Sequence, residues 1–100
     1  MLFEISEHVR GRLSQVCQKY YVQRLAVFGS TLHGEARDDS DLDILVEFVP
    51  GHAPGFAFAR LERELSAIFG RQVDLRTPYD LSQYFREEVL KEAKPLYGAN

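Results

Sequence analysis

Apolar side chains recur every three or four residues in two long stretches of the chain. The first stretch runs from Phe3 to about Tyr20, and the second covers residues 56–69. This spacing places apolar side chains on one face of an α-helix, so each stretch is predicted to form an amphipathic helix. A further helix is expected around residues 81–93, where it would end before Pro95.

Three shorter apolar segments between these helices have the pattern of β-strands. Residues 24–29 form an apolar run closed by a glycine, and residues 41–48 place apolar side chains at every second position. A period of two predicts a strand with one packed face, and residues 72–76 repeat the pattern. Residues 30–34 are long enough for only a short turn of helix. The expected fold is an α/β (α+β) domain in which helices flank a small mixed sheet of three to four strands.

Chain length limits what this domain can hold. The chain has 100 residues, of which 45% are hydrophobic, and this fits a single folded domain covering residues 1–100. A domain of this size buries roughly 65% of the surface that its unfolded chain exposes, which is enough for one modest core. A second domain to hold an acceptor does not fit. Any group-transfer enzyme built on this domain is therefore expected to receive its acceptor from another molecule.

Charge and cysteine content narrow the functional classes further. The net charge is −3, and 12 basic residues are scattered among 15 acidic ones, so direct nucleic-acid binding is not expected. The single Cys17 cannot form an internal disulfide, which favours a reducing compartment, and its helical segment predicts a buried thiol. The first residues lack a basic start followed by an apolar stretch, so no membrane association is expected.

Five residues form a candidate site for chemistry. Gly29 and Ser30 follow the first strand, Asp41 and Asp43 begin the second on one face, and Asp74 is the acid within the third. Each feature alone is common, and a solvated acidic loop is the simplest reading of residues 37–43. Together, however, three carboxylates on neighbouring strands would repel one another unless a cation lay between them. A divalent metal site is therefore predicted at this end of the sheet.

The expected metal is Mg²⁺, which prefers carboxylate oxygens and is usually shared with substrate phosphates. Two such ions about 4 Å apart can stabilise the attacking and the leaving oxygen of an in-line displacement at phosphorus. Gly29 would allow close backbone approach, and the N–H groups after it would attract phosphate. Ser30 could donate a hydroxyl to the same phosphate. The pattern therefore indicates transfer of a phosphorus-containing group.

The same five residues carry a family resemblance. Gly29-Ser30, ten further residues, Asp41-x-Asp43 and a later Asp74 in a strand resemble the signature of the polymerase-beta-type nucleotidyltransferase superfamily. The short chain and the run GSTLHGEARDDSDLDILVEF resemble more closely the minimal nucleotidyltransferases, the MntA-like antitoxins that are paired with HEPN-domain RNase toxins. This resemblance covers nearly the whole chain and implies the nucleotidyltransferase fold.

The resemblance also implies an activity and a partner. MntA-like proteins use ATP and Mg²⁺ to place AMP on a tyrosine of the cognate HEPN toxin, which silences the toxin. Carried over by position, Asp41, Asp43 and Asp74 would bind two metal ions, and Gly29 and Ser30 would hold the triphosphate. Asp74 would also help to deprotonate the incoming hydroxyl. A hetero-oligomer with the toxin in a bacterial or archaeal cytoplasm is what the family implies.

Two other functions remain open at the level of sequence. The domain could transfer a nucleotide to a small molecule or to an RNA end, although its small size and acidic charge argue against both. It could also be a non-catalytic antitoxin that neutralises its partner by complex formation alone. The intact carboxylates argue against a purely binding role, although catalysis and tight binding can coexist. No residue is assigned to recognition of the base.

Overall fold

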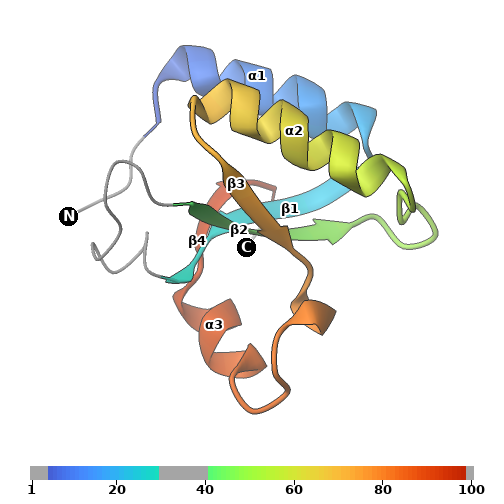
Figure 1. Ribbon diagram of the computed structural model, residues 1–100, viewed down its shortest axis with the longest axis vertical. Coiled ribbons are helices and arrows are strands. Elements are labelled where there is room, and N and C mark those ends of the chain that lie inside the picture. The colour runs from blue at the N-terminus through green and yellow to red at the C-terminus, as the bar shows by residue number, and fades with distance from the viewer. Residues whose placement is uncertain (1–4, 30–40, 99–100) are drawn as a thin grey trace.

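The computed structural model describes residues 5–29 and 41–98 (Figure 1). These residues form helices, strands and one short 3-10 helix in the following order: α1 (Glu7–Lys19), β1 (Val22–Val27), β2 (Leu42–Phe48), α2 (Ala57–Phe69), β3 (Val73–Arg76), the 3-10 helix η2 (Pro78–Asp80), α3 (Arg86–Glu92) and β4 (Lys94–Tyr97).

The strands form one mixed sheet of four strands in the order β3-β2-β1-β4. β1 pairs antiparallel with β2 and with β4, whereas β2 and β3 are parallel. Helices α1 and α2 cover one face of this sheet, and η2 and α3 lie on the other side (Figure 1). The predicted α+β fold, with helices flanking a mixed sheet of three to four strands, is confirmed.

The hydrophobic core fills the space between the sheet and the helix pair α1 and α2. Leu13 and Cys17 of α1 are fully buried, and burial raises the pKa of the Cys17 thiol to about 12, which confirms the predicted buried thiol. The other fully buried large side chains of this core come from β1, β2, β3 and α2: Leu25, Val27, Leu42, Ile44, Val46, Leu61, Leu65 and Val73. Leu45 is also buried, but it belongs to the opposite face of β2. The period-two pattern of β2 thus places its even-numbered residues in this core.

Local signals set the ends of the two long helices. Ser6 is the N-cap of α1, and its hydroxyl accepts a hydrogen bond from the Val9 N–H at 3.2 Å, so this helix begins at Glu7 rather than at Phe3. Gly70 ends α2 in the left-handed conformation, with a φ of 69°. The start of α1 and the end of α2 therefore lie where the capping residues are.

The region near the C-terminus differs from the prediction. The expected helix over 81–93 is shorter and begins at Arg86, and the four residues after Ala93 form β4 at the edge of the sheet. Pro95 fits there because an edge strand has one side without ladder partners. The strand was not predicted because four residues with a proline show no clear alternation.

Two other sequence predictions depend on which residues are described. The short helix expected at residues 30–34 lies outside the described ranges. Within residues 5–29 and 41–98, no helix has the length and apolar content needed to cross a membrane.

Candidate active site

Two of the predicted acids lie side by side on the face of the sheet opposite to α1 and α2, which we name the open face. Asp43 and Asp74 are register partners in the parallel pair of β2 and β3. Neighbouring strands are separated by about 4.8 Å, so the two carboxylates start from adjacent backbone positions. Leu42 and Ile44, which flank Asp43 in the chain, are fully buried on the face covered by helices. Asp43 and Asp74 therefore belong to the opposite face, below which η2 and α3 lie (Figure 1).

Gly29 brings the turn after β1 against the Asp43 carboxylate. Gly29 has a φ of 70°, a backbone conformation that favours glycine. A Cβ atom built on Gly29 would lie 2.6 Å from Asp43 Oδ2 and 3.2 Å from Asp43 Cγ, so a side chain at this position would force the carboxylate to shift. The Phe28 N–H donates a hydrogen bond to the Asp43 carbonyl oxygen at 3.1 Å and fixes the approach of the two segments. The fold thus joins Gly29, Asp43 and Asp74 in one place.

Asp74 has a cationic neighbour on its own strand. Arg76 donates to Asp74 Oδ2 at 3.3 Å, and the Asp74 side chain is 34% exposed against 48% for Arg76. Both side chains lie on the open face, because Val73 and Leu75 occupy the buried face of β3. Water screens an ion pair with this much exposure, so its contribution to stability is small. The Arg76 guanidinium, beside Asp74, nevertheless places one positive charge at the candidate site.

The contacts of this group do not test the other two predicted residues, Asp41 and Ser30. Asp41 immediately precedes β2 and is exposed, while the next residue, Leu42, donates its N–H to the Gln72 carbonyl oxygen at 2.8 Å. Among the described residues, no three His, Cys, Asp or Glu side chains are close enough to form a metal site. Ser30 lies outside the described residues. The metal role of the three acids and the phosphate role of Ser30 therefore stay predictions.

The donor set still suits a hard cation. Asp43 and Asp74 are partly exposed carboxylates on adjacent strands, and Gly29, which lies against Asp43, has no side chain of its own to occupy the space beside that carboxylate. Carboxylate oxygens are the ligands that Mg²⁺ prefers. Residues at these positions are thus compatible with Mg²⁺ shared with a phosphate.

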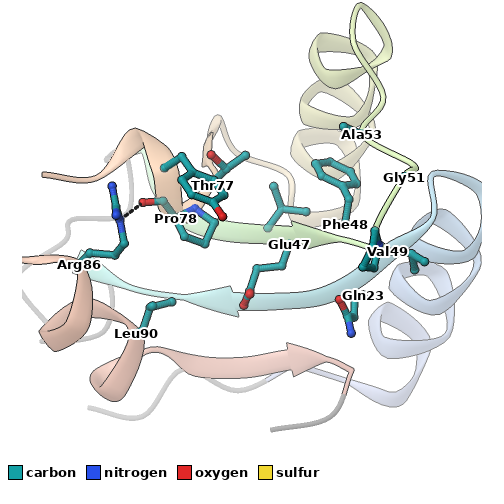
Figure 2. A pocket seen from close by; sticks show the side chains of 13 residues that line it. Gln23, Glu47, Phe48, Val49, Gly51, Ala53, Thr77, Pro78, Arg86 and Leu90 are labelled. Atoms are coloured by element: carbon teal, nitrogen blue, oxygen red, sulfur yellow. Dashed lines mark hydrogen bonds between the residues drawn. The ribbon is translucent and has the colours of Figure 1, made fainter. Parts of the chain in front are cut away.

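A groove of about 590 Å³ opens farther along the same side of β2 (Figure 2). Its walls come from the end of β2 and the following loop on one side, and from Thr77, Pro78, Tyr79, Arg86 and Leu90 on the other. The sequence interpretation did not assign these residues, because they were included in a turn and a helix. One signal in the sequence could have pointed to this region: the aromatic residues of TPYDLSQYF lie close together and do not follow helical spacing.

The fold and these residues define a nucleotidyltransferase-type domain, and comparison with known proteins agrees. The family model of the nucleotidyltransferase domain matches residues 9–96. The protein adenylyltransferase MntA of Thermococcus cleftensis is 36% identical over 93 residues, which cover 91% of each chain. This chain therefore belongs to the nucleotidyltransferase domain family and is a relative of the MntA protein adenylyltransferases.

Two solved structures show the same architecture. One, described as a minimal nucleotidyltransferase, is 41% identical, has a TM-score of 0.72 and matches over 88% of both chains. The other contains a tri-AMPylated HEPN toxin of Shewanella oneidensis in complex with an MNT antitoxin. It has a TM-score of 0.64 at 20% identity and covers 95% of this chain and 74% of that one, a likeness of fold alone.

Proposed function

We propose that this protein is an adenylyltransferase antitoxin that transfers AMP from ATP to a tyrosine of a cognate HEPN RNase toxin and thereby neutralises it. The observation that carries this proposal is the pairing of Asp43 with Asp74 against the Gly29 turn. The likeness to a named protein adenylyltransferase over 91% of the chain supports the reaction. The AMPylated HEPN toxin in the MNT complex supports the choice of partner. ATP is a cytoplasmic substrate, so we place the reaction in the cytoplasm.

The proposed reaction is an in-line displacement at the α-phosphorus of ATP. The acceptor tyrosine oxygen forms a bond to this phosphorus, and the bond from the α-phosphorus to the bridging oxygen breaks. Pyrophosphate leaves with the electron pair of that bond, and the tyrosine proton passes to Asp74 or to solvent. Because no covalent enzyme intermediate is needed, the contribution of the protein is to position the reactants and to provide electrostatic complementarity.

Each site residue has a proposed role. The backbone at Gly29 lets the triphosphate approach closely, and Ser30 donates its hydroxyl to a phosphate oxygen. Asp41, Asp43 and Asp74 would hold Mg²⁺, with two ions expected. When bound, Mg²⁺ supplies positive charge to the phosphate oxygens. Arg76 keeps the Asp74 carboxylate oriented on the open face, at the 3.3 Å contact described above.

Intact-mass measurement of the two partners tests the proposal directly. The chain is incubated with ATP, Mg²⁺ and the HEPN protein encoded beside it, and the masses of both are recorded. Wild type should add AMP to the partner, and Asp43→Ala should lose at least about 100-fold in rate while keeping its melting transition, because a charge-positioning group is removed. Glu7→Ala, at an exposed position on α1, serves as the control and should transfer AMP normally.

A cellular measurement separates catalysis from binding. The double variant Asp41→Asn, Asp43→Asn is expressed with the toxin, and growth is compared with wild type. We expect growth to stop, because the acids are required for AMP transfer. Full protection by the double variant would show neutralisation by complex formation alone and would overturn the catalytic proposal.

A further inference from the structure

The segment from Thr77 to Glu92, which we name the α3 arm, has no buried residue. It contains η2 and α3 and includes six large apolar side chains: Tyr79, Leu81, Tyr84, Phe85, Val89 and Leu90. Tyr79, Tyr84 and Phe85 are 86%, 83% and 60% exposed. A single exposed apolar residue is ordinary, whereas several neighbouring exposed aromatics mark an interaction site.

The α3 arm borders the candidate active site. Thr77 follows Asp74 by three residues, so their Cα atoms are at most about 11 Å apart. The arm lies on the side of the sheet opposite to α1 and α2, which is the side of Asp43 and Asp74 (Figure 1). A protein whose tyrosine reaches Asp74 brings its own backbone to this side of the sheet. Its surface then meets the α3 arm.

The outward charge of the α3 arm is acidic. The Arg86 guanidinium turns inward and donates to the Pro78 carbonyl oxygen at 2.7 Å and to the Leu81 carbonyl oxygen at 3.1 Å. Figure 2 shows the first of these bonds at the wall of the groove. Glu87 and Glu88, in contrast, are exposed in the first turn of α3. Lys91 in the last turn of α3 is also exposed, so a partner meets aromatic rings and more carboxylates than cations.

Resting on the proposed function, we propose that the α3 arm is the docking surface for the toxin, and that it covers the basic RNA-binding surface around the acceptor tyrosine. An RNase needs cationic side chains to bind phosphates, so its substrate surface complements the acidic arm. Exposed aromatics such as Tyr84 and Phe85 are the residue types that anchor interfaces. Docking would then block RNA access and present the tyrosine to Asp74 in one event.

The test measures binding of the HEPN partner by calorimetry without nucleotide. Two variants change the arm: Tyr84→Ser with Phe85→Ser, and Glu87→Lys with Glu88→Lys. Each should raise the Kd for the partner at least about tenfold, as loss of interface anchors or of charge complementarity does. Phe56→Ser, at a fully exposed aromatic at the start of α2, is the matched control and should bind as wild type.

Other readouts separate the outcomes. An RNA substrate of the toxin should compete with wild-type chain for the partner, and the Kd for ATP should be equal in all variants. Wild-type affinity in both arm variants would overturn the docking proposal, and so would an arm-dependent dimer of this chain in size-exclusion chromatography. If wild type binds through the arm but transfers no AMP, the proposed function fails while the docking surface stands.

Discussion

At the scale of single residues, Gly29 sets the geometry of the candidate site. Its positive φ and the absence of a side chain allow the Asp43 carboxylate to lie against the turn after β1. The effect of the positive φ can be separated by experiment from the effect of the close contact with Asp43. Gly70 has nearly the same φ, 69°, but open space where a Cβ would be. Gly29 therefore has a positional role that Gly70 does not share.

We expect Gly29→Ala to lose at least about tenfold in AMP transfer, because its Cβ would displace a charge-positioning carboxylate. Gly70→Ala should keep the wild-type rate. Both variants should lose about 1 kcal/mol of unfolding free energy, since each forces alanine into the left-handed region. Urea unfolding and single-turnover mass measurements check both quantities. Equal transfer rates in the two variants would show that the contact with Asp43 does not matter.

At the scale of elements, α2 protects the outer edge of β3. The Val73 N–H donates to the Ser66 hydroxyl oxygen at 2.9 Å, and the Leu75 N–H donates to the Glu62 carboxylate at 3.0 Å. Ser66 in turn donates to the Glu62 carbonyl oxygen at 2.9 Å. The strand that carries Asp74 is therefore held by β2 on one edge and by polar side chains of α2 on the other.

Ser66→Ala should cost about 1–3 kcal/mol of unfolding free energy, because it leaves the buried Val73 N–H without its acceptor. Ser14→Ala on α1 is the matched control. The hydrogen bond that its hydroxyl accepts from Gln18 is exposed, so the effect of this substitution should stay within about 0.5 kcal/mol. Denaturant unfolding of the three proteins gives these values, and an equal cost at both serines would refute the role of Ser66 at this edge.

At the scale of the whole molecule, one polar cluster ties α1 to α2. Glu64 of α2 accepts hydrogen bonds from Lys19, at 2.8 Å, and from the Tyr20 hydroxyl at the end of α1. These two bonds, with that from Lys19 the larger cause, lower the pKa of the Glu64 carboxyl below its usual 4.5. Ionised Glu64 therefore favours the folded state.

The sign of the pH dependence follows from this shift. The unfolded chain takes up the Glu64 proton near pH 4.5, whereas the folded chain takes it up only at lower pH. The stabilisation from Glu64 is thus complete above pH 4.5 and is lost as the pH falls through the folded pKa. Glu64→Gln should be less stable than wild type at pH 7, and the difference should shrink in acid. Thermal unfolding from pH 7 to pH 2 measures it, and a constant difference would contradict this account.

Most elements and the candidate residues could be predicted from the amino-acid sequence. Apolar periods predicted α1, α2 and the strands β1, β2 and β3, because burial of one face leaves a local pattern that can be read from neighbouring positions. Spacing singled out Gly29, Ser30, Asp41, Asp43 and Asp74, and the family they resemble is confirmed by the match over residues 9–96.

Local sequence patterns do not show which distant segments meet, and this became visible only in the folded chain. The register of Asp43 with Asp74, the contact of Gly29 with Asp43 and the pairing of β4 with β1 join residues that are far apart in the chain. Tyr84 and Phe85 of the α3 arm were included in the helix predicted over 81–93, and Tyr79 in the turn before it, for the same reason. Local periodicity indicates which side of an element is apolar. Strand pairing and exposure depend instead on which other elements of the chain pack against that side.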